Sequence, residues 1–433
     1  MTGPAGQPDA AMLHRSGIAA AQRGQGAQAR QMLEKAAAMR PNALPILVDL
    51  AQVQLMTGDQ AAATETFQRC VKIDPGLVPA WLNLGILMMH AYRTDEAAEC
   101  FQKAAEGNPK LVDAHMGLGV VRQRQKRPKE AVAAFQRAAA LAPDNPEVLS
   151  NLGGALHEAG DARGAVPCFR KAIELAPQHA ALHTHLGSLL HEVEGGEAGL
   201  PHYNDALRLV PGEPRTLALK GSALIGLGRA EEAARIFDHD ALVASHQFTE
   251  APGYPDLDAF NRDLASHSVS HPSLVQEPLG RTTRGGGQTG QLFGATEGPF
   301  PVLEQMLRGA IDAYFADPAR SQHPYCPIRT KPGHIFAWAT VLDSGGYQDP
   351  HNHPSGVLSG VYYVQLPESG EPGAIEFGRP AAPFTAPSEP DVKLIRPATG
   401  KVVLFPSFYW HRTIPFPGEG RRISIAFDLM MDG

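Results

Sequence analysis

Long hydrophobic runs are missing from this 433-residue sequence. No apolar stretch approaches the ~20 residues that a membrane-spanning helix needs, and residues 1–9 resemble neither a secretory signal nor a helix, so we expect a flexible tail there. Basic charge is also scarce, because 38 lysines and arginines face 45 acidic residues and leave a net charge of −7. That balance argues against general binding to a phosphate backbone. We therefore expect a globular cytoplasmic protein without membrane or nucleic-acid partners.

Cysteine is equally rare. The four cysteines include no CxxC pair, which indicates reduced thiols. Cys70, Cys100 and Cys168 are expected to be small core residues of helical repeats. The sequence also lacks a nucleophile triad, a phosphate-binding loop and a dinucleotide fingerprint. Any chemistry must therefore come from other residue types.

A 34-residue repeat organises the first half of the chain. Proline recurs at this step at Pro41, Pro75, Pro109, Pro143, Pro177 and Pro211. A column of small residues keeps the same step at Gly17, Ala51, Gly85, Gly119, Gly153, Gly187 and Gly221. A second small column is Ala29, Ala63, Ala97, Ala131, Ala165, Gly199 and Ala233, and a bulky column is Leu33, Phe67, Phe101, Phe135, Phe169, Tyr203 and Phe237. Four columns in register predict seven helical units.

The column types have a physical reason. A small residue in each helix lets two antiparallel helices approach, the bulky residue fills the space between units, and proline ends the second helix. The run Trp81–Gly85, followed by Ala97, Phe101 and Pro109, resembles the tetratricopeptide repeat. This resemblance covers about residues 10–245 and implies an all-α superhelix whose concave face holds a peptide.

Positions on the first helices are the candidates for that face. One position of the repeat is occupied by Met89, Gln123, His157 and His191 in successive units. Another position is occupied by Asn83 and Asn151, which could bind a peptide backbone. The alternative is that these are ordinary solvated groove residues. The closing proline is absent from the last unit, where Ser245 stands in its place.

After residue 245 the pattern changes. Glycine and proline increase, and residues 246–298 form either a connector or part of the following domain, which we place at 299–433. An amphipathic helix is expected at about 299–316. Eight short β-rich runs follow at His334–Leu342, Tyr347–His353, Val357–Leu366, Ala374–Phe377, Val392–Ile395, Val402–Phe405, His411–Phe416 and Arg422–Leu429. Their spacing indicates a sandwich or jelly roll.

His351 and His353 are candidate metal ligands. On a strand, residues i and i+2 point to the same face, so both imidazoles can reach one ion. His183 and His185 have the same spacing on a repeat helix, where residues two apart lie roughly 200° around the axis and cannot share an ion. We therefore interpret the first pair as a candidate site and the second as structural or exposed.

A distant histidine and an arginine complete the constellation. His411 follows a strand that turns at Pro406, and Arg422 and Ser424 share one face of the last strand. An arginine among apolar neighbours needs an anionic partner, because a buried unpaired charge costs several kcal/mol. Its planar fork suits a carboxylate. Arg421 faces the other way and is expected to be exposed.

These residues resemble the Fe(II)- and 2-oxoglutarate-dependent oxygenases, and a bacterial and phage subgroup in particular. The resemblance covers about residues 245–433 and rests on His351–Pro354, Leu358–Val364, Leu404–Ser407 and Arg422–Phe427. It implies a mainly β domain, a double-stranded β-helix or jelly roll, that follows the all-α superhelix. It also implies Fe(II) as the metal, 2-oxoglutarate as the co-substrate and hydroxylation as the reaction.

The resemblance implies roles for single residues. His351 would be the first iron ligand and His411 the distal one. Arg422 would hold the far carboxylate of 2-oxoglutarate, with Ser424 adding a hydrogen bond. One of two adjacent tyrosines would add another, and strand alternation lets only one of them face inward: Tyr362 or Tyr363.

One position departs from the family pattern. The common iron-binding set is two histidines and one carboxylate, and His353 stands where Asp or Glu is usual. His353 either ligates the metal, which we favour, or lies behind the ligands. A third possibility is that Asp349 contributes, although Pro350 makes that geometry awkward.

Several functions fit this pattern. The leading hypothesis is an oxygenase that acts on a protein or peptide recruited by the repeats. The alternative is a non-catalytic repeat scaffold with a degenerate metal-binding β domain. A structural zinc site is a further possibility. A cupin-like three-histidine dioxygenase is disfavoured by Arg422 and Ser424, because that chemistry does not need a carboxylate clamp.

Overall fold

Two compact units make up the structure, Met1–Pro177 and Gln178–Gly433. The computed structural model describes residues 9–278, 280–326, 333–353, 355–381 and 391–430. Apart from Asp9, the predicted tail at residues 1–9 lies outside the described residues.

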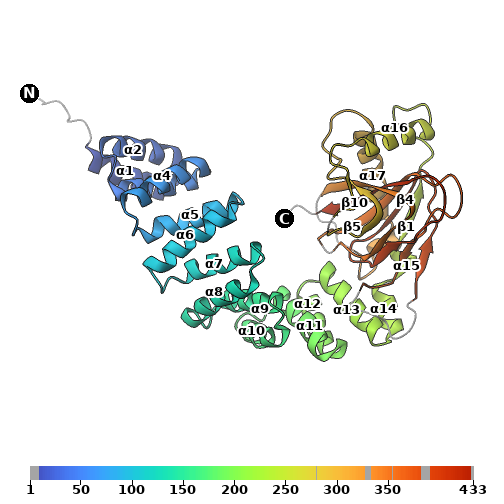
Figure 1. Ribbon diagram of the computed structural model, residues 1–433, viewed down its shortest axis with the longest axis horizontal. Helices are drawn as coiled ribbons and strands as arrows, with labels where there is room; N and C mark the ends of the chain where they lie inside the picture. The colour runs from blue at the N-terminus through green and yellow to red at the C-terminus, as the bar shows by residue number, and fades with distance from the viewer. Residues whose placement is uncertain (1–8, 279, 327–332, 354, 382–390, 431–433) are drawn as a thin grey trace, which may run out of the picture. The chain divides into compact units, whose positions relative to one another are not determined.

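In the part of the first unit that the structure describes, from Asp9 onward, there are five antiparallel helix pairs (Figure 1). They are α1 (Ala10–Gln22), α2 (Gly26–Met39), α3 (Leu44–Met56), α4 (Gln60–Ile73), α5 (Val78–His90), α6 (Thr94–Gly107), α7 (Val112–Arg124), α8 (Pro128–Leu141), α9 (Pro146–Glu158) and α10 (Ala162–Leu175). Each repeat proline follows the end of a second helix, as Pro41 follows α2 and Pro75 follows α4. The predicted all-α repeat superhelix is confirmed.

The bulky column fills the space that the small column opens. A Cβ atom added at Gly85 on α5 would lie 2.7 Å from Cε1 of Phe101, which comes from α6. One added at Gly117 on α7 would lie 2.5 Å from the same atom. Phe101 therefore packs against its own unit and the next one, as the column pattern predicts.

Two adjacent glycines of α9 should respond to alanine in opposite directions. A Cβ atom at Gly153 would lie 2.6 Å from the Phe169 ring, whereas one at Gly154 would meet nothing within 4 Å. Gly153→Ala should destabilise the protein by about 1–3 kcal/mol through overpacking. Gly154→Ala should stabilise it by up to about 1 kcal/mol, because alanine is the better helix former. Urea denaturation measures both, and a shift of the same sign in the two variants would contradict this packing.

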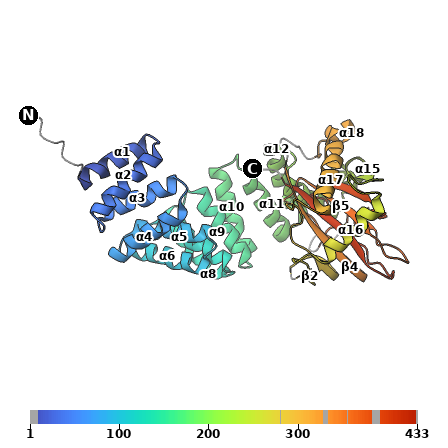
Figure 2. The same cartoon turned by 90° about the horizontal axis from the view of Figure 1, so that it is seen from above.

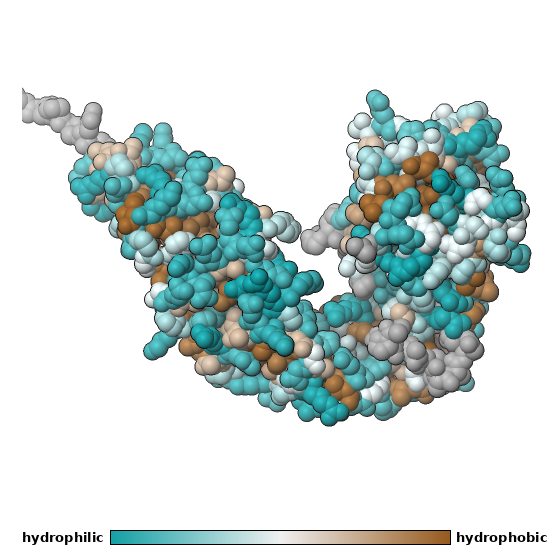
Figure 3. Space-filling model, viewed as in Figure 1, coloured by the Kyte–Doolittle hydropathy of each residue, from teal (hydrophilic) through white to brown (hydrophobic). Residues whose placement is uncertain are grey.

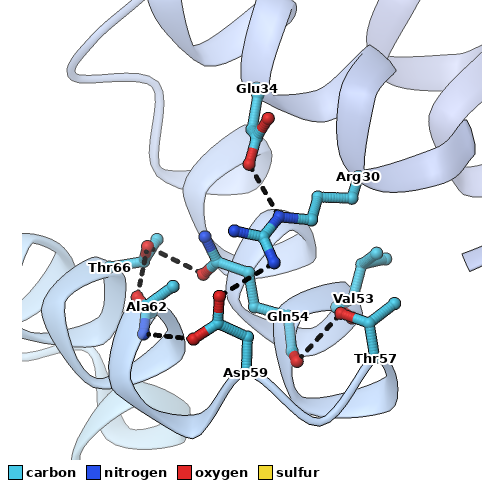
Figure 4. Close-up of polar contacts among 8 residues, drawn as sticks. All are labelled: Arg30, Glu34, Val53, Gln54, Thr57, Asp59, Ala62 and Thr66. Carbon is cyan, nitrogen blue, oxygen red and sulfur yellow. Dashed lines mark hydrogen bonds and ion pairs between the residues drawn. The ribbon is translucent and has the colours of Figure 1, made fainter. Parts of the chain in front are cut away.

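Polar contacts join the first two repeats (Figure 4). Arg30 on α2 donates from its Nη1 to Oδ2 of Asp59 at 2.9 Å. Asp59 also accepts from the backbone N–H of Ala62 at 3.0 Å and so caps the N-terminus of α4. Thr66 on α4 donates to the buried Gln54 on α3 at 2.9 Å. These hydrogen bonds therefore add polar contacts between neighbouring helices to the apolar packing.

The second unit begins with two more helix pairs. They are α11 (Ala180–Glu194), α12 (Gly196–Leu209), α13 (Pro214–Gly226) and the short α14 (Ala230–Ile236), followed by α15 (His239–Leu242). Ser245, which replaces the last repeat proline, lies in strand β1 (Ala244–Gln247) opposite Val403. The Phe237 ring packs 5.4 Å from the Tyr409 ring, between centroids. The last repeat and the β-sheet therefore share one hydrophobic core.

Among the described residues, the β-sheet has ten strands, in the order β1-β8-β5-β10-β4-β9-β6-β7, and β3 links β2 to β4. The strands after β1 are β2 (Val275–Gln276), β3 (Thr283–Gln288), β4 (His334–His351), β5 (Leu358–Gln365), β6 (Ile375–Phe377), β7 (Lys393–Ile395), β8 (Lys401–Pro406), β9 (His411–Thr413) and β10 (Arg422–Met430). All named pairs are antiparallel. This sheet is consistent with the predicted jelly roll.

The first two predicted runs of the β domain are one strand. Residues 334–342 of β4 pair with β10, whereas Gln348 and His351 near its end pair with β9. The intervening glycines predict a break, but in the structure they lie within β4 and only shift its register with β3. The predicted division between 342 and 347 is therefore wrong, and β4 is the strand that connects the two halves of the sheet.

Helices cover one face of the sheet (Figures 1 and 2). The predicted helix at 299–316 is α17 (Pro299–Ala316), which short α18 (Pro318–Ser321) follows. Helix α16 (Leu257–Val269) was not predicted, and it packs against β5 and β4. Its Asn261 accepts a 2.8 Å hydrogen bond from the Tyr362 hydroxyl. Residues between the repeats and α17 thus contribute strands β2 and β3 to the sheet and helix α16 to the layer of helices on its face.

Hydrophilic side chains dominate the face of the molecule drawn in Figure 3, with hydrophobic side chains interspersed. Within the described stretches, no helix combines the length and apolar character that a bilayer crossing requires.

Candidate metal centre

Three histidines meet where β4 and β9 pair. His351 stands opposite His411 in the strand register, and His353 follows just after β4 ends. The ring centroids of His351 and His411 are 4.3 Å apart, and each lies 5.1 Å from the His353 ring. One ligand nitrogen from each of the three lies within 4.8 Å of the others. The structure therefore brings these three histidines together, and metal binding by them stays a prediction.

Hydrogen bonds leave one nitrogen of each ring for a ligand. Nδ1 of His351 lies 2.7 Å from the Asp349 carbonyl oxygen, and Nδ1 of His411 lies 3.0 Å from that of Tyr409. Nδ1 of His353 lies 2.7 Å and 2.9 Å from the two carboxylate oxygens of Asp428. Carbonyl and carboxylate oxygens only accept, so each Nδ1 carries the proton. In the neutral form of each ring the lone pair is then on Nε2, which is the tautomer a metal needs.

Burial keeps two of these rings neutral. Burial, and then the neighbouring His353, lowers the pKa of His351 to about 4. Burial and the other two histidines lower the pKa of His411 well below its ordinary value. Because both pKa values lie below neutrality, these imidazoles are uncharged near pH 7. They can therefore bind a cation without first losing a proton.

Asp428 was missed by the sequence analysis. It holds His353 and also accepts a 2.6 Å hydrogen bond from the Ser359 hydroxyl. The side chains of His353 and Asp428 are only 15% and 14% exposed. The signal was available, because Arg422, Ser424 and Asp428 all lie on alternate positions of one strand. Following the alternate positions from Ser424 through Ala426 leads to Asp428, on the same face of the strand.

Arg422 is a buried cation beside the histidines. Its side chain lines the same cavity as His351, His353 and His411, and the residue is 1% exposed. Its guanidinium carbon lies 5.2 Å from the Tyr363 ring centroid, and Nη1 donates to Thr413 over a long 3.5 Å. Among the residues that the structure describes, Nε has no hydrogen-bond partner and no carboxylate pairs with the group. Burial lowers the pKa of this guanidinium.

Strand alternation separates the remaining candidates. Ser424 and Tyr363 line the cavity, as do Trp338 and Thr413, which the sequence analysis did not single out. Tyr362 faces the opposite side of β5, where it bonds to Asn261. Of the two tyrosine alternatives, only Tyr363 therefore faces the histidines.

Asp349 does not join the histidines in the structure. Its Oδ2 lies 2.8 Å from Nη2 of Arg284, and its backbone oxygen supports His351. The helical pair used for comparison behaves as helix geometry predicts. His185 lies 3.4 Å from Nη1 of Arg215, whereas His183 faces Asp205 on the next helix. Arg421 is exposed and pairs with Asp343 at 3.1 Å.

The candidate groove residues lie on first helices of their repeats. His157 is exposed, and the other five are half-buried: Asn83, Met89, Gln123, Asn151 and His191. Asn83 donates to the Pro79 carbonyl on its own helix at 2.8 Å. The Met89 carbonyl accepts from Nη1 of Arg124 on α7 at 3.1 Å. Burial lowers the pKa of His191.

Family models match both parts of the chain. Residues 1–219, just over half of the 433, match "Cilia and flagella-associated protein 70 C-terminal domain", and residues 214–239 match "Tetratricopeptide repeat". Residues 336–428, which contain the three histidines and Arg422, match "Putative 2OG-Fe(II) oxygenase". Among curated proteins there is no match.

Three solved structures are among those similar to the chain. YrrB, described as a TPR protein with an unusual peptide-binding site, is 22% identical, with 43% of this chain and 97% of YrrB covered and a TM-score of 0.41. MamA is 22% identical, with 40% and 94% covered and a TM-score of 0.37. PilF of Pseudomonas aeruginosa is 20% identical, with 48% and 94% covered and a TM-score of 0.41.

Proposed function

The chain belongs to the tetratricopeptide-repeat family and carries a domain of the 2OG-Fe(II) oxygenase family, and from this premise we propose that it is an Fe(II)- and 2-oxoglutarate-dependent hydroxylase. In this proposal residues 246–298 belong to the oxygenase domain rather than to a connector. The contacts of β3 with β4 and of α16 with β5 support that assignment.

Iron would be held by Nε2 of His351, His353 and His411. The fit rests on the donor set, because each Nδ1 already donates to an oxygen and each Nε2 is left with a lone pair. Imidazole is a suitable ligand for Fe(II). The bound metal would supply oxygen activation for C–H hydroxylation. Asp428 replaces the usual coordinating carboxylate indirectly, since it places negative charge behind His353.

Arg422 is the single observation that carries the co-substrate assignment. A fully buried guanidinium without a carboxylate partner among the described residues is costly, by several kcal/mol in typical proteins. A ligand carboxylate that enters the cavity would pair with it and remove that cost. Ser424 and Tyr363 line the same cavity and can add hydrogen bonds. The dicarboxylate 2-oxoglutarate provides one carboxylate for Arg422 and a keto acid for the metal.

The repeats would recruit a protein or peptide substrate. Their first helices present half-buried amides at one phase, Asn83 and Asn151, and mixed side chains at another. Tetratricopeptide repeats are protein-interaction modules, and their array of first helices forms an extended surface. We propose that a segment bound there has its side chain hydroxylated at the metal centre.

Succinate formation tests this function. Purified protein given Fe(II), oxygen and 2-oxoglutarate should release succinate, whereas His411→Ala should release at least 100-fold less, because one of three ligands is lost. His246→Ala is the matched control, since His246 is an exposed histidine on β1 and should leave turnover unchanged. Equal succinate formation by wild type and His411→Ala would rule out the proposed metal centre.

A further inference from the structure

A second group of metal-ligand residues lies in the sixth repeat. His183 on α11 and His202 and Asp205 on α12 place one ligand atom each within 4.8 Å of the others. Nδ1 of His183 is 3.9 Å from Oδ2 of Asp205, and the two imidazole centroids are 6.2 Å apart. His202 and Asp205 are three residues apart on one helix, so they face the same side. None of the three belongs to the cavity around His351.

Two of the three residues break the pattern of their repeat columns. His183 has a histidine counterpart in His115, and the other members of its column are Leu13, Leu47, Trp81, Leu149 and Leu217. His202 stands where they have Met32, Thr66, Cys100, Ala134, Cys168 and Ile236. Asp205 reverses a basic column of Lys35, Arg69, Lys103, Arg137 and Lys171. Two separate columns depart in the same unit, and the fold places one ligand atom of each departing residue within 4.8 Å of His183.

The chemistry of the group suits a transition metal. Two imidazoles and a carboxylate are common ligands of Zn(II), with a water in the fourth position. Ligand atoms about 2.1 Å from a tetrahedral ion lie roughly 3.4 Å apart, so small side-chain rotations would close the observed spacings. Oδ1 of Asp205 accepts from Arg208 at 2.8 Å, which leaves Oδ2 toward His183. The Asp205 side chain is 38% exposed, so an ion can reach the group from solvent.

We propose that His183, His202 and Asp205 form a second metal site, which takes Zn(II) and ties α11 to α12. The core of the β domain includes Leu200 and Tyr203 of α12 and Leu217 and Leu224 of α13. A zinc ion at this place therefore stiffens the repeat that packs into the same core as the sheet. The site is independent of iron, 2-oxoglutarate and turnover.

Zinc titration of the full-length, metal-free protein tests the site, with a chromophoric chelator as competitor. Wild type should bind two Zn(II) ions, one at each histidine group, and the His351→Ala/His411→Ala double variant should keep one. His202→Ala and His183→Leu should each lose one, and both restore residues that occur in these columns, as Ala134 and Leu149 show. Asp205→Lys restores the basic column and should also lose one ion.

His185→Ala is the matched control, because His185 lies on the same helix and pairs with Arg215 instead. It should still bind two ions. In the His351→Ala/His411→Ala background, zinc should raise the thermal midpoint, and adding His202→Ala should abolish that rise. If His202→Ala and His183→Leu keep both ions, or if the His351→Ala/His411→Ala variant binds none, the proposal is overturned. Failure of the oxygenase assay alone would leave these outcomes unchanged.

Discussion

Replacing Arg422 with methionine should raise the 2-oxoglutarate concentration for half-maximal succinate formation by about 100-fold. Losing one partner of a buried charge pair costs about 2–5 kcal/mol in typical complexes, and 100-fold corresponds to about 2.7 kcal/mol. Arg422 fits that case because it is 1% exposed and its hydrogen bond to Thr413 is long, at 3.5 Å. Initial-rate measurements over a range of 2-oxoglutarate concentrations give the value.

The same substitution should leave the ligand-free protein at least as stable as wild type. Methionine removes a buried charge that no carboxylate neutralises among the described residues, and such replacements are often neutral or stabilising. Arg421→Met is the matched control, since this adjacent arginine is exposed and pairs with Asp343. It should not change the 2-oxoglutarate dependence. A normal dependence in Arg422→Met would show that the co-substrate carboxylate binds elsewhere.

Asp428→Asn should weaken Fe(II) binding by about 10–100-fold. Carboxylates that hydrogen-bond to metal-bound histidines raise the basicity of the ring and fix its tautomer, and their loss typically has this effect. Asp428 contacts Nδ1 of His353 through both carboxylate oxygens, at 2.7 Å and 2.9 Å. The asparagine side chain keeps the shape of the Asp428 carboxylate and one acceptor oxygen, but it loses the negative charge. Anaerobic titration with Fe(II) measures the affinity.

This variant also decides what His353 does. If His353 binds iron, the loss of negative charge behind it must weaken the metal site. If His353 lies outside the ligand set, Asp428→Asn should leave the affinity unchanged. Asp343→Asn is the control, because Asp343 is exposed and its carboxylate pairs with Arg421. The control should bind Fe(II) as wild type does.

The repeat architecture could be predicted from the sequence because the residues that pack the helices recur at the same positions of each 34-residue unit. Gly85 and Phe101 show this directly, since a Cβ atom at the glycine would overlap the ring. The sequence did not reveal that the last repeat packs into the sheet. Phe237 looks like any other member of its column, yet it contacts Phe408 and Tyr409 of the β domain.

The β domain was harder to delimit. The glycines of β3 disfavour a strand in isolation, but Gly286 lies so close to β4 that an added Cβ atom would be 2.2 Å from the Val341 oxygen. Residues 283–288 therefore form a strand because they pair with β4, and not because their own sequence favours one. Helix α16 did carry a local signal that was overlooked, because Asp256 caps it by accepting from the backbone N–H of Ala259.

The candidate site was predictable in part. Strand alternation placed His351 near His353 and Arg422 on the face of Ser424. Alternation alone did not decide between Tyr362 and Tyr363, because both flanks of β5 are buried. The partner of Tyr362 is Asn261, from a helix about 100 residues earlier in the chain. Such long-range contacts carry no local sequence signal.

An anaerobic crystal structure with bound Fe(II) and 2-oxoglutarate would show the iron ligands and the co-substrate contacts together. We expect one iron bound by Nε2 of His351, His353 and His411, with Asp428 still hydrogen-bonded to Nδ1 of His353. We also expect a bidentate contact between Arg422 and the far carboxylate of 2-oxoglutarate. An iron that His353 does not touch, or a 2-oxoglutarate carboxylate away from Arg422, would show that the proposed metal and co-substrate site is wrong.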